Sequence, residues 1–270
     1  MTTLGPIGLA SGYPYTDDSS VVADEATHAE SLGFSTLWRS GNLAMVDVAV
    51  RATDTIPVAT GIIPVSVVPS ADVVATYTAL QRDHPGRFVV GLGGARNAHP
   101  LATLNAYLDE LDTAGIAASS RMLAALGPRM LALSRDRADG AYPFLVTPSY
   151  VAAARQMLGP DRQLAVLLMV IPVRDREQAR RAAAEPLGFL AKAGGYRRNL
   201  MRLGFSEIDI DGVSDRLLDG ITAWGDVASI ASRVAEYRGE GADQIVLRIL
   251  GVDDLSEWRA RLAEGLIGAG

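Results

Sequence analysis

The sequence predicts an α/β protein, a (β/α)8 or TIM barrel with an extra helical segment between its seventh and eighth strands. Short apolar runs alternate with helix-period segments along almost all of the 270 residues. The apolar runs are continuous rather than alternating, which indicates strands buried on both faces of a parallel sheet. Eight strand–helix pairs over about 250 residues fit such a barrel. The alternative, an open doubly wound sheet, usually has fewer strands.

The elements are expected in a regular order. Strands are predicted over residues 5–9, 35–39, 58–63, 87–92, 121–126, 142–146, 163–171 and 244–250. Helices are predicted over 19–32, 45–54, 70–83, 101–114, 128–138 and 149–158, with a longer helical region over 175–238 and a last helix from Asp254. Leucines recur at spacings of three or four in the helix at 101–114 and form one apolar stripe. No linker divides the chain, so residues 1–270 are interpreted as a single domain.

Composition excludes several classes of protein. The net charge is −6, which argues against a nucleic-acid surface, and there is no cysteine for disulfides, thiolate metal sites or a nucleophile. The most apolar segment, 164–173, has ten residues, whereas a membrane span needs about 20. The first residues do not resemble a signal peptide. We therefore expect a cytoplasmic protein that binds neither membranes nor nucleic acid.

The end of the fourth strand carries the most unusual pattern, "HPGRFVVGLGGARNAHP". An apolar run leads into Gly91, Gly93 and Gly94, and Arg96 follows. Glycines permit close backbone approach and unusual backbone angles, but the third glycine of a dinucleotide-binding fingerprint is missing. Either a ligand passes close to this strand end or the barrel needs a tight turn there. His99 comes next and could reach the mouth of the barrel.

Other strand ends add polar groups at the same edge. Gly127 and Pro128 precede a helix whose N-terminal N–H groups can bind an anion, with Arg129 adding charge. Thr147, before Pro148, repeats the pattern, although a plain helix start explains it better when taken alone. The second strand ends in "LWRSGN". Arg197, Arg198 and Arg202 fall at helical spacing and are interpreted as a solvated helix face rather than a ligand site.

Known catalytic motifs are missing. The sequence has no H-x-H, H-E-x-x-H, G-x-S-x-G or Walker pattern, and no paired carboxylates at strand ends. We predict no metal site. A site without its own acid, base or nucleophile suits a bound cofactor that carries the chemistry while the protein orients it.

Several segments together resemble the bacterial luciferase-like superfamily, most closely its actinobacterial branch of F420-dependent oxidoreductases. They include "LGFSTLW", "VATGII", "HPGRFVVGLG", "LATLNAYLDELD", "AALGPRMLALSRDRADGAYPFLVTP", "RRNLMRLGF", "SDRLLDGITAWGD" and "GADQIVLRIL". The resemblance runs over nearly the whole chain. It implies a (β/α)8 barrel, a deazaflavin or flavin held at the C-terminal ends of the strands, and hydride transfer to or from an unidentified organic substrate.

The resemblance also implies positions for the cofactor and the substrate. A non-prolyl cis peptide at Gly61–Ile62 would form a bulge, with Ile63, that backs the flavin ring. The cofactor's stem and phosphate would lie along Gly91, Gly93, Gly94, Arg96, Asn97, Leu126, Gly127, Arg129 and Thr147. Ser11, Trp38 and Arg39 would face the substrate, and the candidates for a catalytic residue are Trp38, Arg39 and His99.

The chain departs from the family pattern in segments near the site. The stretch "RSGNLAMVD" after the second strand and "ARNAHP" after the glycines are short, and Pro64 replaces a residue that is commonly polar. A reshaped pocket follows. We expect coenzyme F420 as the cofactor, with an FMN-dependent monooxygenase and a non-catalytic cofactor-binding barrel as alternatives. A homodimer acting on a small-molecule substrate is also expected.

Overall fold

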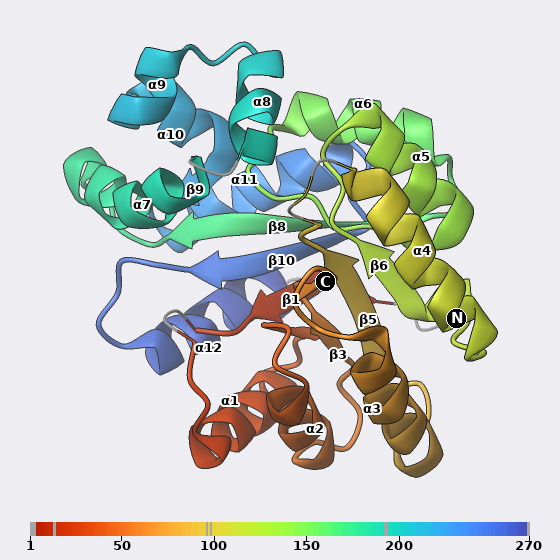
Figure 1. Ribbon diagram of the computed structural model, residues 1–270. Coiled ribbons are helices and arrows are strands. Elements are labelled where there is room, and N and C mark those ends of the chain that lie inside the picture. The colour runs from red at the N-terminus through yellow and green to blue at the C-terminus, as the bar shows by residue number, and fades with distance from the viewer. Residues whose placement is uncertain (1–3, 13–14, 96, 98, 192–193, 269–270) are drawn as a thin grey trace.

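Eight parallel strands close into a barrel in the computed structural model (Figure 1), which describes residues 4–12, 15–95, 97, 99–191 and 194–268. The strands are β1 (Ile7–Ala10), β2 (Leu37–Arg39), β3 (Val58–Thr60), β5 (Phe88–Gly93), β6 (Arg121–Leu123), β7 (Gly140–Ala141), β8 (Gln163–Ile171) and β10 (Gln244–Ile249). Each pairs with the next, and β10 pairs with both β8 and β1, which closes the barrel. The predicted fold class is confirmed.

Helices surround the strands. The outer helices are α1 (Ser19–Ser31), α2 (Leu43–Arg51), α3 (Ser70–Asp83), α4 (Pro100–Thr113), α5 (Pro128–Arg137), α6 (Pro148–Leu158), α11 (Val227–Gly239) and α12 (Leu255–Leu266), with a short 3-10 turn, η1 (Ala118–Ser120). The additional helices are α7 (Arg176–Ala191), α8 (Gly194–Arg202), α9 (Glu207–Gly212) and α10 (Asp215–Ile221). In Figure 1 these four gather on one side of β8, so the extra helical segment is confirmed.

The third predicted strand is divided in two. Residues 58–63 were expected as one strand, but β3 ends at Thr60 and a separate strand, β4 (Ile63–Pro64), pairs with β5. The peptide bond between Gly61 and Ile62 is cis, as the resemblance implies.

Two further strand boundaries differ from prediction. The sixth strand was expected over 142–146, but β7 ends at Ala141, because Pro143 has no N–H to donate and Leu145 has a φ of 55°. Only Phe144 continues the pairing, through an isolated bridge to Leu167. The helical region over 175–238 contains a short strand, β9 (Thr222–Trp224), which pairs with the end of β8.

Side chains inside the barrel form the floor of the site. They include both small and large side chains: Ala10, Trp38, Ala59, Val89, Met122, Tyr142, Ala165, Leu167, Met169 and Val246. The rings of Trp38 and Tyr142 stack, with centroids 3.9 Å apart and planes 6° from parallel. Such a pair stabilises a fold by about 0.5–1.5 kcal/mol beyond its burial. In the described part of the chain, no helix is both long and apolar enough to cross a membrane.

Candidate active site

A small apolar cavity lies where the strands end, as expected for the functional face of this barrel. We call it the barrel-mouth cavity; its volume is about 200 Å³. It is lined by Tyr15, Gly61, Ile62, Ala124, Tyr142, Phe144, Leu167, Pro186, Phe189, Leu190, Tyr196, Arg248 and Leu250. A Cβ at Gly61 would lie 2.8 Å from Cε1 of Tyr142, so only glycine allows the bulge to meet this ring. Arg248 carries the only formal charge among these described lining residues.

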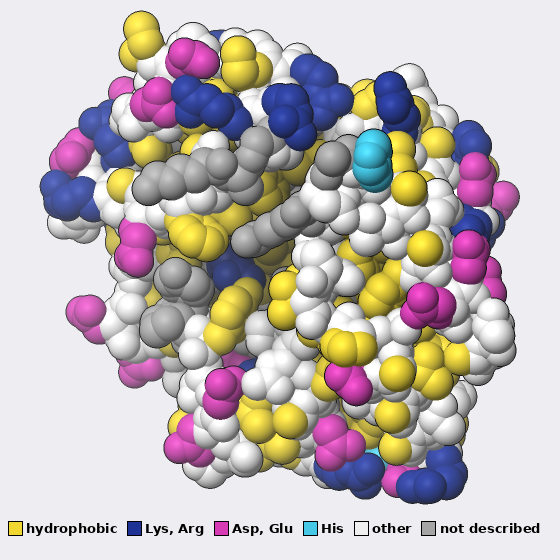
Figure 2. Space-filling model, in the orientation of Figure 1, with side chains coloured by type: hydrophobic (Ala, Val, Ile, Leu, Met, Phe, Trp, Pro, Cys, Tyr) yellow, Lys and Arg dark blue, Asp and Glu magenta, His cyan; other side chains and the backbone are white. Residues whose placement is uncertain are grey.

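A larger cleft of about 900 Å³ adjoins this cavity, and we call it the arginine cleft. Its wall consists of Gly93, Gly94, Ala95, Asn97, Pro100, Leu101, Leu104, Ala124, Leu126, Gly127, Met130, Phe189, Leu190, Gly195, Tyr196, Arg198 and Arg202. Two arginines and no acidic residue occur among these described residues. In Figure 2 hydrophobic side chains gather in a hollow near the middle of the visible face, with Lys and Arg side chains along its upper edge. The cleft is therefore cationic although the chain is acidic overall.

The guanidinium of Arg202 lies beside the start of α5. Gly127 is the N-cap of this helix and Pro128 its first residue, and no side chain caps it. A Cβ at Gly127 would lie 3.4 Å from Nη1 of Arg202. A helix N-terminus next to a guanidinium combines backbone N–H donors, a favourable helix dipole and a full charge. This corner of the arginine cleft can therefore bind a phosphate or carboxylate.

The three glycines at the end of β5 are required for different structural reasons. A Cβ at Gly91 would lie 1.7 Å from the carbonyl oxygen of Thr60, whose hydroxyl donates to the Gly91 carbonyl (2.9 Å) and accepts from its N–H (2.8 Å). Gly94 has a φ of +68°, which favours glycine. Gly93 and Gly94 line the arginine cleft, whereas Gly91 is buried against β3. Barrel geometry alone thus accounts for Gly91.

The other predicted cofactor residues divide between the cavities and the core. Ile62 lines the barrel-mouth cavity, and Leu126 and Asn97 line the arginine cleft. Ile63 is fully buried in the core, and Arg129 is exposed on α5 outside the lining. Thr147 is the N-cap of α6 and accepts a hydrogen bond from the Tyr150 N–H at 3.3 Å, so it starts a helix as an isolated pattern would. Arg96, which was also predicted to contact the cofactor, lies outside the described residues.

The substrate-side candidates line neither cavity. Successive side chains of a strand point to opposite faces. Trp38 points into the barrel, where it supports Tyr142, so Arg39 points outward towards α1 and α12. Arg39 and Ser11 line a separate cleft of about 530 Å³ between these helices. His99 is exposed at the start of α4.

Arg39 belongs to a buried ion cluster. The Glu25 carboxylate accepts hydrogen bonds from the guanidinium groups of Arg39 and Arg259, and from the Gly12 N–H at 2.8 Å. The three charged side chains are 1%, 8% and 10% exposed for Arg39, Arg259 and Glu25. The cluster links the first two strands to α1 and α12, so Arg39 has a structural role here.

Sequence reasoning missed the polar groups of the barrel mouth. Arg248 is the only charged residue in "QIVLRIL", near the C-terminal end of its strand, and this was an available signal. Tyr142 was predicted only as part of a strand. Burial raises the pKa of Tyr142 well above its ordinary value, although the charge of Arg248 opposes this effect. Its phenol therefore stays protonated and can donate a hydrogen bond.

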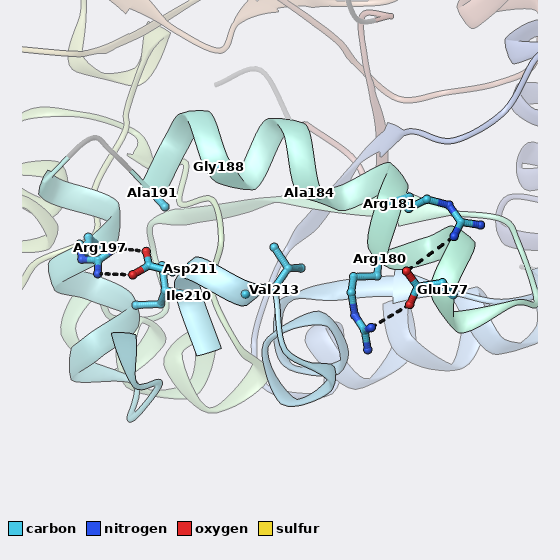
Figure 3. Close-up of a pocket in the computed structure, with 11 residues that line it drawn as sticks. Glu177, Arg180, Arg181, Ala184, Gly188, Ala191, Arg197, Ile210, Asp211 and Val213 are labelled. Carbon is cyan, nitrogen blue, oxygen red and sulfur yellow. Dashed lines mark hydrogen bonds and ion pairs between the residues drawn. The ribbon is translucent and has the colours of Figure 1, made fainter. Parts of the chain in front are cut away.

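A further groove, of about 590 Å³, lies on the outer side of α7 (Figure 3). Its arginines face acidic partners: Arg197 Nη1 lies 2.7 Å from Asp211 Oδ1, and Arg180 Nη1 lies 2.8 Å from Glu177 Oε2. The charges of this groove are therefore compensated within the protein. The three α8 arginines interpreted as one solvated face lie on two surfaces, since only Arg198 and Arg202 line the arginine cleft.

Comparison with known proteins supports the architecture. No protein-family model matches the sequence, and no curated protein matches it. An F420-dependent secondary alcohol dehydrogenase in complex with an F420–acetone adduct superposes with a TM-score of 0.74 at 15% identity, over 97% of this chain and 99% of that one. The coenzyme F420-dependent tetrahydromethanopterin reductase from Methanopyrus kandleri gives 0.75 at 14%, over 98% and 99%.

An FMN enzyme is similar to the same extent. The oxygenating constituent of 3,6-diketocamphane monooxygenase from Pseudomonas putida, in complex with FMN, gives a TM-score of 0.69 at 13% identity, over 96% of both chains. At these identities the likeness concerns the fold. The chain thus has the barrel fold that F420-dependent and FMN-dependent enzymes share.

Proposed function

We propose that the protein is an oxidoreductase that transfers a hydride between coenzyme F420 and an organic substrate. The observation that carries the proposal is that the apolar barrel-mouth cavity adjoins the cationic arginine cleft. An apolar cavity at the strand ends suits a flat ring, and the cationic cleft beside it suits a long anionic tail. The structural neighbours that bind F420 support it through the shared fold.

The residues present fit such a cofactor. Ile62, Ala124 and Tyr142 would surround the ring, and Arg198 and Arg202 would meet the tail's phosphate and carboxylates beside the N-terminus of α5. When bound, the deazaflavin supplies a carbon that accepts or donates a hydride. The protein's own residues then bind and orient the two reactants, which agrees with the lack of acid–base motifs.

FMN is the second candidate, because the apolar cavity would accept either ring and one structural neighbour binds FMN. FMN carries a single phosphate, whereas F420 carries a phosphate and an oligoglutamate tail. Arg198 and Arg202 form no ion pair with an acidic side chain of the described residues, and two such arginines along a cleft of about 900 Å³ favour the longer anionic chain. The F420 proposal therefore has priority, and FMN is a competing outcome of the same experiment.

The test uses two neighbouring arginines. F420, FMN and NADPH are titrated in parallel by quenching of tryptophan fluorescence. We expect F420 to bind most tightly, and Arg198→Ala and Arg202→Ala each to weaken it by about 1.5–3 kcal/mol, the scale of a charged hydrogen bond. Arg197→Ala is the control, because Arg197 faces Asp211 in the outer groove. Tighter binding of FMN, or an equal loss in the control, would contradict the proposal.

Gly93→Val is a poor probe of the same cleft. A Cβ at Gly93 would lie 2.8 Å from the Cβ of Ala124, so this substitution strains the barrel as well as filling the cleft. Arg129 is exposed and does not line the arginine cleft, whereas Arg202 does, so substitution of Arg202 is the better test of cofactor binding. The arginine variants separate loss of cofactor from loss of fold.

A further inference from the structure

Arg248 is a cation placed in an apolar wall. Alternate residues of β10 point into the barrel: Val246 belongs to the interior core, Arg248 and Leu250 line the barrel-mouth cavity, and Leu247 and Ile249 pack against the outer helices. Around Arg248 the cavity is lined by Phe144, Leu167 and Leu250. The half-buried charge therefore lies in the wall of the cavity, at the C-terminal end of the strands.

The partners of Arg248 leave its charge uncompensated. Its Nη2 donates to the Tyr15 hydroxyl at 2.6 Å, and the guanidinium carbon lies 5.4 Å from the centre of the Tyr15 ring. Its Nε is buried without a hydrogen-bond partner among the described residues. No acidic side chain of that part of the chain forms an ion pair with Arg248, whereas Arg39, Arg180 and Arg197 each pair with a carboxylate. Tyr15 orients the guanidinium but supplies no negative charge.

Arg248 is half-buried, and the fully buried arginines of the described chain show the contrast. They have carboxylate or carbonyl partners: Arg39 and Arg259 with Glu25, Arg121 with Asp112, and Arg87 with the carbonyl groups of Thr53 and Ile56. A buried charge is costly unless it is paired. A cation that lacks such a partner inside a ligand cavity indicates that the ligand provides it.

Tyr142 adds a second unmatched donor to the same cavity. Tyr142 is 4% exposed and its ring stacks on Trp38. Its hydroxyl has no hydrogen-bond partner in the part of the chain that the structure describes. Buried hydroxyl groups are normally paired, so an orphan at a cavity wall points to a missing acceptor. The Arg248 Nε and the Tyr142 hydroxyl both lack an acceptor among the described residues, and both side chains line the barrel-mouth cavity.

Resting on the proposed function, we propose that the substrate is an apolar monocarboxylic acid whose carboxylate binds Arg248, with the Tyr142 hydroxyl as a further donor. The planar guanidinium can hold both oxygens of a carboxylate, which a neutral carbonyl cannot match. The hydrocarbon part would contact Phe144, Leu167 and Leu250. The arginine cleft is left to the cofactor.

The experiment separates substrate from cofactor. F420 affinity is measured first, and hexanoate is then titrated into the F420-loaded protein by calorimetry, with hexanamide as the neutral isostere. We expect hexanoate to bind more tightly than hexanamide, and Arg248→Met to weaken hexanoate by about 30-fold or more, as when a buried charge loses its partner. The same variant should leave hexanamide and F420 binding unchanged. Arg202→Met is the matched control and should weaken F420 but not hexanoate.

Tyr142→Phe provides a second variant that keeps the ring and the stack on Trp38. It should weaken hexanoate by about fivefold to tenfold, the scale of one hydrogen bond, without lowering the melting temperature. If hexanoate binds no better than hexanamide, or equally well to Arg248→Met, the substrate class is wrong. If Arg248→Met loses F420 instead, Arg248 serves the cofactor. If neither F420 nor FMN binds the parent, the proposed function fails, and the hexanoate titration on cofactor-free protein still tests Arg248.

Discussion

Replacing Glu25 with alanine tests how the start of the barrel is held together. Among the described residues, Glu25 has the only carboxylate that pairs with Arg39 and Arg259, whose side chains are 1% and 8% exposed. The substitution removes this carboxylate and with it the acceptor of the Gly12 N–H. Breaking a buried ion pair by removing one partner costs about 3–5 kcal/mol, because the other charge stays buried. At about 2–4 °C per kcal/mol for a chain of this size, the melting temperature should fall by about 6–20 °C.

The assay is thermal and urea unfolding followed by circular dichroism. Asp47→Ala is the matched control, because the Asp47–Arg51 pair on α2 has side chains 37% and 43% exposed and should contribute about 0–1 kcal/mol. A triple variant, Glu25→Leu with Arg39→Met and Arg259→Met, should recover most of the lost stability, since no charge is left unpaired. A loss in Glu25→Ala no larger than that in Asp47→Ala would refute the reasoning.

Three further substitutions test other parts of the structure. Burial raises the pKa of Glu30, but hydrogen bonds from the backbone N–H groups of residues 54–56 outweigh it and lower the pKa to about 2, below the ordinary 4.5. The ionised Glu30 therefore contributes its full stabilisation above pH 4.5, and this stabilisation is lost as the pH falls towards 2. In urea unfolding at pH 7, Glu30→Gln should be less stable than the parent, and the difference in free energy of unfolding should be smaller at pH 3. Gly91→Ala would place a methyl group 1.7 Å from the Thr60 carbonyl oxygen, and we expect little folded protein by circular dichroism; a normal melting curve would contradict the packing. The leucine side chain of Gly127→Leu would project towards the guanidinium end of the Arg202 side chain. F420 affinity should therefore fall by about tenfold or more at an unchanged melting temperature, and equal affinity would mean that the F420 tail lies elsewhere.

The barrel could be predicted because its signals are local. Seven of the eight predicted strands overlap an observed strand, since a continuous apolar run bounded by turn residues indicates a buried strand whatever its neighbours are. The sixth, predicted over 142–146, lies just after β7. The errors occur where the backbone departs from regular pairing. Pro143 and the positive φ of Leu145 end β7 early, and β9 depends on pairing with β8, which no local pattern within 175–238 reveals.

The site was harder to predict because it depends on which way a side chain faces. Trp38 and Arg39 are neighbours on one strand, and neighbouring strand residues point to opposite faces. Only Trp38 points into the barrel, so the two side chains cannot contact the same ligand. Arg197 and Arg198 also face different surfaces, because consecutive residues of an α-helix point about 100° apart. Tyr142, just after β7, and Arg248, on β10, are about a hundred residues apart in the sequence, so no local spacing predicts that they line one cavity.

The two cavities share a wall, and this has a consequence for how ligands assemble on the protein. Phe189 and Leu190 on α7 and Tyr196 on α8 line both the barrel-mouth cavity and the arginine cleft. A shift of these helices therefore changes both compartments together, so their occupancies are linked equilibria. Linkage is reciprocal: the factor by which one ligand alters the affinity of the other applies equally in the opposite direction. Altering Leu190 to admit a new substrate would thus also reset the concentration of cofactor that the protein needs.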